Sequence, residues 1–230
     1  MDESTGRSKA ARVTDMFERI ARNYDLMNRL MTAGQDVTWR RRVIELANPH
    51  PGDRFLDIGT GTGDLTREAL RQQPQAQVVA ADFTLGMMFA GRKSGDLPFV
   101  AADALHLPFA DDSMDVTVSG FLFRNVSDIH LAVREQYRVL KNGGRMVSLD
   151  TTRPKKNLFS PFIWLHMHVG IPLLGRLLSG TSDAYRYLPE STEHFLFAEQ
   201  LAQVLSGESF KDVHFERRMF GTIAIHWGKK

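Results

Sequence analysis

The sequence predicts an α/β fold built on a doubly wound, mostly parallel sheet of seven strands, and two observations carry this prediction. Between residues 55 and 150, short apolar runs alternate with segments of helical periodicity, which is the pattern of βαβ units with helices on both faces of a sheet. Two more strand-like runs then close the chain without a helix between them, which indicates an antiparallel C-terminal strand.

The N-terminal region is expected to be helical. Residues 1–12 are polar and lack apolar periodicity, so we expect disorder there. Apolar residues recur at helical spacing over 13–30, and a second helix is expected over 37–46, before Pro49. We therefore expect a helical cap over 13–48 on a single domain that spans 13–230.

The elements that follow are read in order from their periodicity and turn residues. Strands are expected at 55–59, 77–82, 97–103 and 114–121. A fifth strand is expected to follow the Gly143-Gly144 turn and to end at residue 150. Helices are expected at 63–72, 84–93, 127–140 and 197–206. The apolar segment 158–178 contains prolines and glycines that favour two short helical pieces, and the last two strands fall in FKDVHFERR and MFGTIAIHWG.

Composition excludes several kinds of site. The 230 residues include no cysteine, which rules out disulfides, thiolate zinc sites and a cysteine nucleophile. The net charge is only +2 and no basic run is interleaved with aromatic residues, so we expect no nucleic-acid partner. Since neither a secretory signal nor an apolar run long enough to span a bilayer is evident, we expect a cytoplasmic protein.

A glycine-rich turn follows the first strand, at Gly59, Gly61 and Gly63. Glycines let a backbone turn sharply and let a ligand approach it closely. The next helix would offer free N–H groups and the positive end of its dipole to a carboxylate or phosphate. The alternative is a tight strand-to-helix turn that binds nothing.

Two acidic residues weigh against that alternative. Asp82 ends the second strand about 20 residues beyond the turn, where an acid commonly binds ribose hydroxyls. Asp103, followed by Ala104, ends the third strand, where a carboxylate can accept the amine of an adenine. The turn can hold an amino-acid group, Asp82 is placed to bind ribose, and Asp103 is placed to bind adenine. Together these features favour S-adenosylmethionine (SAM) over NAD.

Over nearly its whole length the chain resembles the ubiquinone/menaquinone-biosynthesis C-methyltransferases, which are class I SAM-dependent methyltransferases with a Rossmann-like sheet. The resemblance rests on LDIGTGTGDLT, which marks the superfamily, and on FERIARNYDLMNRLMTAGQDVTWRRR, FRNVSD and YRYLPES, which mark the family. It implies SAM as cofactor, with S-adenosylhomocysteine as product, and a prenylated quinol as substrate. The cofactor-binding residues expected from the turn and the resemblance are Asp57, Gly59, Gly61, Thr62, Gly63, Asp82, Phe83, Asp103, Ala104 and Gly120.

The implied reaction needs a nucleophilic ring carbon, which a quinol gains when a hydroxyl loses its proton. Phenols ionise near pH ~10, so the enzyme must stabilise the oxyanion. Arg124, which stays protonated, is expected to do so directly or through a water; the alternative is a structural ion pair. Asn125 would hold that water or a quinol oxygen, and Tyr24 either contacts substrate or packs the helical cap. No metal is expected, because the sulfonium already activates the methyl group.

The apolar segment would serve the substrate's tail. Residues 155–195 are expected to form a substrate lid, and 158–178, with Phe162 and Trp164, suit contact with the inner face of a membrane; the alternative is a core helix. The enzyme would then be peripheral at that membrane. The oligomeric state stays open, with a homodimer among the alternatives.

Some residues depart from the family pattern and leave the acceptor in doubt. Leu122 and Phe123 stand where relatives usually have Gly-Leu, and Asp150-Thr151-Thr152 where Glu-Phe-Ser is common. The leading hypothesis is methylation of demethylmenaquinol to menaquinol. The alternatives are a methyltransferase for another aromatic or prenylated small molecule, and a non-catalytic cofactor-binding subunit of a quinone-biosynthesis assembly.

Overall fold

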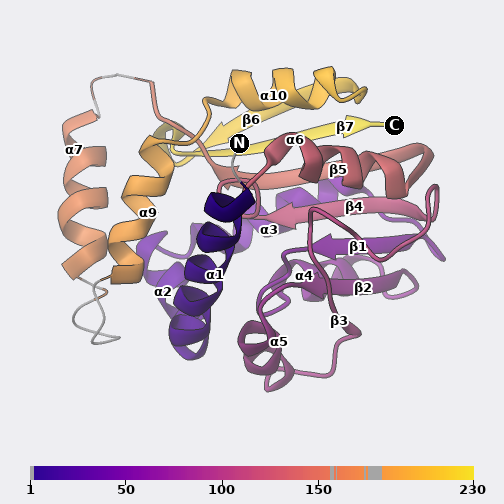
Figure 1. Cartoon of the computed structure of the whole chain (residues 1–230), viewed down its shortest axis with the longest axis horizontal. Helices are drawn as coiled ribbons and strands as arrows, with labels where there is room; N and C mark the ends of the chain where they lie inside the picture. The colour runs from indigo at the N-terminus through magenta and orange to yellow at the C-terminus, as the bar shows by residue number, and fades with distance from the viewer. Residues whose placement is uncertain (1–2, 156–157, 159, 174, 176–182) are drawn as a thin grey trace.

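The computed structural model describes residues 3–155, 158, 160–173, 175 and 183–230, and its centre is one seven-stranded sheet (Figure 1). The strand order is β3-β2-β1-β4-β5-β7-β6. Neighbouring strands from β3 to β5 run parallel, and β7 is antiparallel to both β5 and β6. This confirms the predicted fold. The strands are β1 (Arg54–Ile58), β2 (Gln77–Asp82), β3 (Phe99–Ala101), β4 (Met114–Gly120), β5 (Leu140–Thr151), β6 (Lys211–Arg218) and β7 (Ile223–Lys229).

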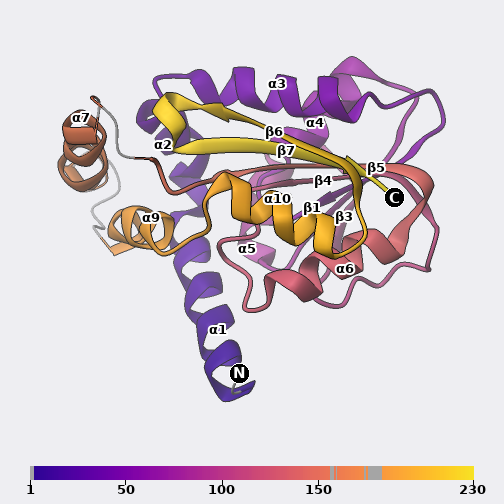
Figure 2. The ribbon, with the colours of Figure 1, turned by 90° about the horizontal axis from the view of Figure 1, so that it is seen from above.

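Helices cover both faces of the sheet (Figure 2). Because successive side chains of a strand point to opposite faces, Phe55 joins the core beneath α3 and α4, and Leu56 joins the core beneath α6 and α10. The helices of the sheet region are α3 (Gln35–Ala47), α4 (Asp64–Gln72), α5 (Leu85–Arg92), α6 (Ile129–Val139) and α10 (Ala198–Gly207).

The N-terminal helices reach further than the sequence led us to expect. Helix α1 (Glu3–Ile20) includes residues 3–12, for which the sequence predicted disorder. Lysine, arginine, alanine and glutamate in this stretch favour a helix even without an apolar stripe. A single 3-10 turn, Ala21–Asn23, joins α1 to α2 (Tyr24–Met31).

The apolar segment forms one helical path where two short pieces were expected. Helix α7 (Ser160–Leu165) continues into a π turn, His166–Gly170, and the chain stays helical to residue 173. Pro161 lies in the first turn, where an N–H has no helical partner, and Pro172 lies two residues after the π turn, where the regular bonding is already altered. Helix α9 (Asp183–Glu193) packs beside α7 (Figure 1). Residues 159, 174 and 176–178 of the predicted 158–178 segment lie outside the described residues.

No helix in the described ranges is both long and apolar enough to cross a bilayer.

Candidate functional site

Two cavities lie at the carboxyl ends of the parallel strands, where open α/β sheets bind ligands. The smaller one, here called the loop cavity, has a volume of about 160 Å³ and adjoins the glycine turn. The larger one, the apolar cavity, has a volume of about 890 Å³ and lies between α1, α2, α7 and the end of β4. The predicted residues that line the loop cavity are Gly59, Gly61, Asp82, Phe83, Asp103, Ala104, Gly120, Tyr24 and Asn125.

The glycine turn has the conformation that its residues suggest. Gly59, Gly61 and Gly63 have φ angles of 68°, 60° and 92°, which favour glycine. A Cβ on Gly59 would lie 3.0 Å from Leu122 Cδ1, and a Cβ on Gly61 would lie 3.3 Å from Met87 Cε. A side chain at either position would therefore crowd Leu122 or Met87, both of which line the loop cavity.

Asp57 lies beneath this turn and does not line the loop cavity. Its Oδ2 accepts hydrogen bonds from the hydroxyls of Thr60 (2.6 Å) and Thr66 (2.8 Å) and from the Thr66 amide (3.1 Å). Burial raises the pKa of this carboxyl to about 6, although the threonine hydrogen bonds act against the rise. The Asp57 side chain is fully buried. Its position therefore supports a role in bracing the turn rather than direct contact with the cofactor.

The other two acids lie where the sequence predicted them. Asp82 accepts from the Gly61 amide (2.7 Å) and the Thr84 amide (2.7 Å), so the end of β2 is tied to the glycine turn. Burial raises the pKa of Asp82, against these backbone hydrogen bonds. Asp103 Oδ1 accepts from the Leu105 amide at 2.9 Å, while its half-exposed carboxyl lines the loop cavity.

Thr62 and Gly63 also lie away from the cavity lining. The Thr62 hydroxyl donates to Asp25 Oδ1 of α2 at 2.7 Å, so this residue fastens the helical cap to the turn. Burial raises the pKa of Asp25, against the hydrogen bond from Thr62. Gly63 closes the turn: it leads into α4 with a left-handed backbone, and a Cβ there would lie 2.5 Å from Leu97 Cδ1.

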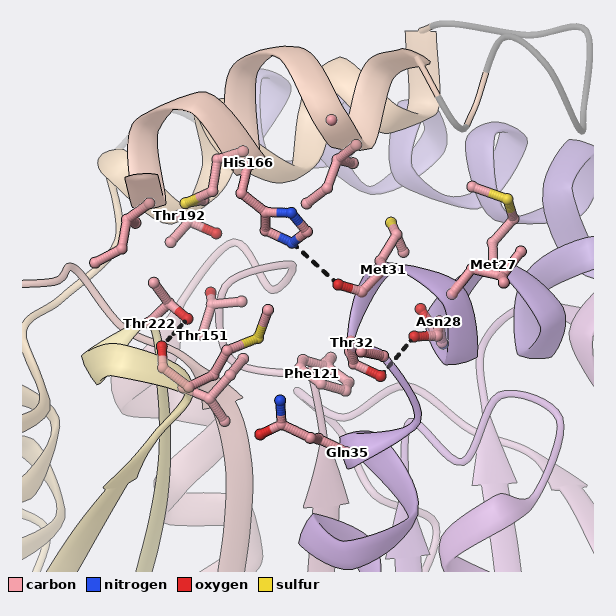
Figure 3. A pocket seen from close by; sticks show the side chains of 18 of the residues that line it. Met27, Asn28, Met31, Thr32, Gln35, Phe121, Thr151, His166, Thr192 and Thr222 are labelled. Atoms are coloured by element: carbon pink, nitrogen blue, oxygen red, sulfur yellow. Dashed lines mark hydrogen bonds between the residues drawn. The ribbon is translucent and has the colours of Figure 1, made fainter. Parts of the chain in front are cut away.

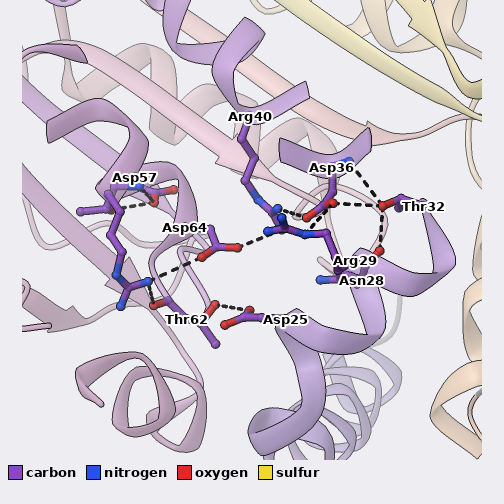
Figure 4. Close-up of polar contacts among 11 residues, drawn as sticks. Asp25, Asn28, Arg29, Thr32, Asp36, Arg40, Asp57, Thr62 and Asp64 are labelled. Carbon is purple, nitrogen blue, oxygen red and sulfur yellow. Dashed lines mark hydrogen bonds and ion pairs between the residues drawn. The ribbon is translucent and has the colours of Figure 1, made fainter. Parts of the chain in front are cut away.

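A buried ion pair reinforces the same junction (Figure 4). Arg40 of α3 contacts Asp36 on its own helix and reaches Asp64 of α4, with 3.2 Å between Nη2 and Oδ2. Arg29 of α2 contacts Asp36 at 3.2 Å. The charges thus join the cap to the first turn of α4. Sequence reasoning missed Arg40, because an arginine within an ordinary amphipathic helix carries no signal of its partners.

Three side chains separate the two cavities and line both: Phe17, Tyr24 and Phe121. Phe17 and Tyr24 meet edge to face with 5.9 Å between ring centroids. Burial raises the pKa of the Tyr24 phenol, against a hydrogen bond with Asn28. Phe121 has a φ of 57°, and its amide donates to Leu149 O at 2.7 Å. A non-glycine residue in this conformation at a cavity wall is typical of functional sites.

Arg124 and Asn125, adjacent in sequence, face different cavities. Arg124 lines the apolar cavity, where its Cζ lies 5.2 Å from the Phe121 ring centroid. Its amide donates to Asp150 Oδ2 at 3.4 Å. Burial raises the pKa of Asp150 to about 6, against the charge of Arg124. Asn125 lines the loop cavity, and its Nδ2 donates to Phe121 O at 2.8 Å.

Tyr187, which the sequence left without a role, completes this cluster. Its hydroxyl donates to Asn125 Oδ1 at 3.1 Å, and its side chain lines the apolar cavity. Burial raises the pKa of this phenol, against the charge of Arg124. The only signal in the sequence was the stretch YRYLPES, which pointed to the family and not to a contact.

The apolar cavity is mainly hydrocarbon with a few polar groups at its wall (Figure 3). Its lining includes Met16, Ile20, Met27, Ile163, Met167 and Ile171. His166 Nε2 lies 3.0 Å from Met31 O, which links the π turn after α7 to the end of α2. Within the described parts of the chain, no group of three or more histidines and acids is placed to hold a metal ion.

The chain is similar to known methyltransferases over nearly its whole length. The chain is 45% identical over 226 residues, 97% of its length, to the ubiquinone/menaquinone biosynthesis C-methyltransferase UbiE of Desulfotalea psychrophila, of which it covers 92%. It is 42% identical over 220 residues, 94% of its length, to the demethylmenaquinone methyltransferase of Thermus thermophilus, all of which is covered. A SAM-dependent methyltransferase structure from Thermotoga maritima matches the fold with a TM-score of 0.66, 18% identity and coverage of 94% of this chain and 99% of that one. The model of the ubiE/COQ5 methyltransferase family matches residues 5–230, and the chain belongs to that family.

Proposed function

We propose that this enzyme transfers a methyl group from SAM to a ring carbon of a prenylated quinol, and that the quinol is demethylmenaquinol, which becomes menaquinol. The observation that carries the proposal is the shared wall: Tyr24 and Phe121 line both the loop cavity and the apolar cavity. A methyl donor in one cavity and an apolar acceptor in the other would meet there. Relatives named for demethylmenaquinone methylation support the choice of acceptor.

The residues of the loop cavity suit SAM. The open glycine backbone and the first turn of α4 would receive the methionine end, Asp82 the ribose, and Asp103 with Ala104 the adenine. Gly59 and Gly61 line the loop cavity, and a Cβ at either position would crowd Leu122 or Met87, which supports this fit. When bound, SAM supplies a methyl group on a sulfonium, whose carbon–sulfur bond breaks with its electron pair left on sulfur as the ring carbon bonds to the methyl.

The chain's own residues would activate the ring. A cationic Arg124 at the cavity wall stabilises a quinol oxyanion, which delocalises negative charge onto the neighbouring ring carbon. Asp150, buried beside the Arg124 backbone, helps to fix the turn that carries this arginine. After the carbon–carbon bond forms, the proton on the methylated carbon would pass through solvent to the quinol oxygen, which restores aromaticity; the proton first lost from that oxygen is released to solvent. Holding the ring still against the donor is the main remaining contribution, since the displacement depends on alignment.

The apolar cavity would receive the start of the prenyl tail. Phe162, Leu165 and Val169 line it although they are 73%, 52% and 46% exposed, so the cavity opens onto an exposed apolar surface. Leu158 and Trp164 extend that surface at 88% and 57% exposure. Such a surface, on a helix that does not span a bilayer, suits peripheral contact with lipid, from which a tailed quinol would enter.

Incubation with labelled SAM and reduced prenyl naphthoquinols and benzoquinols, with mass-spectrometric readout, tests the proposal. We expect label on a ring carbon, and faster transfer to the naphthoquinol. Transfer to oxygen would replace C-methylation with O-methylation, and a lack of transfer to every quinol would overturn the proposal.

A further inference from the structure

A buried hydroxyl without a partner lies in the wall of the apolar cavity. Thr151 ends β5, is only 6% exposed and lines this cavity. In the part of the chain that the structure describes, no group forms a hydrogen bond with its Oγ1. Burying an unpaired hydroxyl destabilises a fold, and such a group in a native structure calls for an explanation.

Two further threonines lie around it. Thr192 and Thr222 also line the cavity, and Figure 3 shows all three on the same side of it, away from Asn28 and Met27. The Thr222 hydroxyl donates to Met219 O at 2.8 Å, which leaves its oxygen able to accept. Three threonines therefore line one side of the apolar cavity.

The end of β5 is held beside the turn that carries Arg124. The Phe121 amide donates to Leu149 O, and Asp150 accepts from both the Arg124 and Thr151 amides, at 3.4 and 2.8 Å. Arg124, from the turn after β4, and Thr151, from the end of the paired strand β5, thus line one cavity. A ring that sets one oxygen at Arg124 can direct another oxygen toward Thr151.

We infer that the Thr151 hydroxyl hydrogen-bonds the second ring oxygen of the quinol, the one beside the prenyl-bearing carbon, and that it sets the preference for rings with two oxygens. The inference rests on the proposed function and adds a specificity-determining residue to it. A site built to bond a substrate hydroxyl discriminates strongly against an analogue that lacks it, because the site's polar group is then left unpaired.

The test compares two acceptors: a 2-prenyl-1,4-naphthalenediol, and 3-prenyl-1-naphthol, which keeps only the hydroxyl next to the acceptor carbon. The measured quantity is the ratio of kcat/KM for the two. We expect Thr151→Val, which keeps the side chain's shape, to lower the wild-type ratio by roughly 10-fold, and Thr151→Ser to preserve it. The melting temperature of Thr151→Val should equal or exceed that of the wild type, because an unpaired buried hydroxyl is removed.

Thr152→Val is the matched control. Thr152 is a buried neighbour outside the cavity lining, and its hydroxyl donates to Leu196 O at 3.2 Å. This variant should lower the melting temperature and leave the ratio as it is. An unchanged ratio in Thr151→Val, with an active wild type, would overturn the role of Thr151 alone. A wild type that methylates neither acceptor would overturn the proposed function together with it.

Discussion

The phenol of Tyr187 donates a hydrogen bond to Asn125 Oδ1 across 3.1 Å, and so joins helix α9 to the turn after β4. The same amide uses its Nδ2 to bond Phe121 O. The orientation of Asn125 is therefore set from both sides, by the residue that divides the two cavities and by a helix of the expected substrate lid.

Removing the Tyr187 hydroxyl should lower catalytic efficiency far more than cofactor affinity, because Asn125 in the loop cavity stays bonded to Phe121 O. For Tyr187→Phe we expect kcat/KM for the quinol to fall about 10-fold, because Asn125 loses a buried partner. Affinity for S-adenosylhomocysteine, measured by calorimetry, should stay within twofold. Tyr137→Phe, on α6 and outside both cavity linings, is the control. Equal kinetics for the two variants would contradict the role of Tyr187.

Arg124→Ala should separate catalysis from cofactor binding. Since Arg124 lines the apolar cavity and not the loop cavity, we expect kcat to fall about 10²-fold or more while S-adenosylhomocysteine binds normally. Arg134→Ala, which removes an exposed arginine beside Glu208, should leave both quantities unchanged. A parallel loss of cofactor affinity would assign Arg124 to the cofactor site.

Arg40→Ala should weaken the anchor of the helical cap. Arg40 is 9% exposed and lies between Asp36 and Asp64, and loss of one partner from a buried ion pair strongly destabilises a fold. We expect the free energy of unfolding in urea to fall by about 3 kcal/mol, at the lower end of the usual range because Arg29 stays beside Asp36. Arg42→Ala, on the exposed side of the same helix, should cost less than about 1 kcal/mol. Equal losses would show that the buried network adds nothing to stability.

Asp57 should give stability a definite dependence on pH. Burial raises its pKa from 3.8 to about 6, so the folded state holds the proton more tightly than the unfolded state does. As the pH rises from about 4 to 6, ionisation of this carboxyl therefore lowers the free energy of unfolding. The total loss above that range is about 3 kcal/mol. Asp57→Asn lacks this cost, so its free energy of unfolding minus that of the wild type should rise over the same range. Urea titrations at several pH values measure the difference; a constant one would show that burial does not shift this pKa.

Lipid contact should depend on the exposed face of α7. We expect the protein to co-sediment with vesicles of phosphatidylglycerol and phosphatidylethanolamine, and Phe162→Asp to weaken partitioning about 10-fold, since burial of one phenylalanine is worth roughly 1.5–3 kcal/mol. Phe89→Asp is the matched control, because Phe89 is 60% exposed on α5, away from α7 (Figure 1). Equal effects of the two changes would argue against a surface centred on α7.

Much of the architecture could be read from local patterns. The alternation of apolar strands and amphipathic helices predicted the sheet, and β2 has the predicted bounds. The start of α1 was missed because residues 3–12 are polar and have no apolar stripe. The unbroken path through α7 was missed because a π turn adjusts the backbone to Pro172 in a way that residue preferences do not reveal.

Within the site, the sequence alone determined what depends on position along a strand. Gly59, Gly61, Asp82 and Asp103 follow strand ends, and parallel strands bring those ends to one edge, so their convergence on the loop cavity could be predicted. Tertiary structure alone decided what depends on packing between distant segments. Packing made Asp57 a hydrogen-bond partner of Thr60 and Thr62 a partner of Asp25. It also placed Tyr187 against Asn125 and left the buried Thr151 hydroxyl without a hydrogen bond among the described residues. The reason is that backbone periodicity fixes which way a side chain leaves its own element, whereas its partners are set by how whole elements pack.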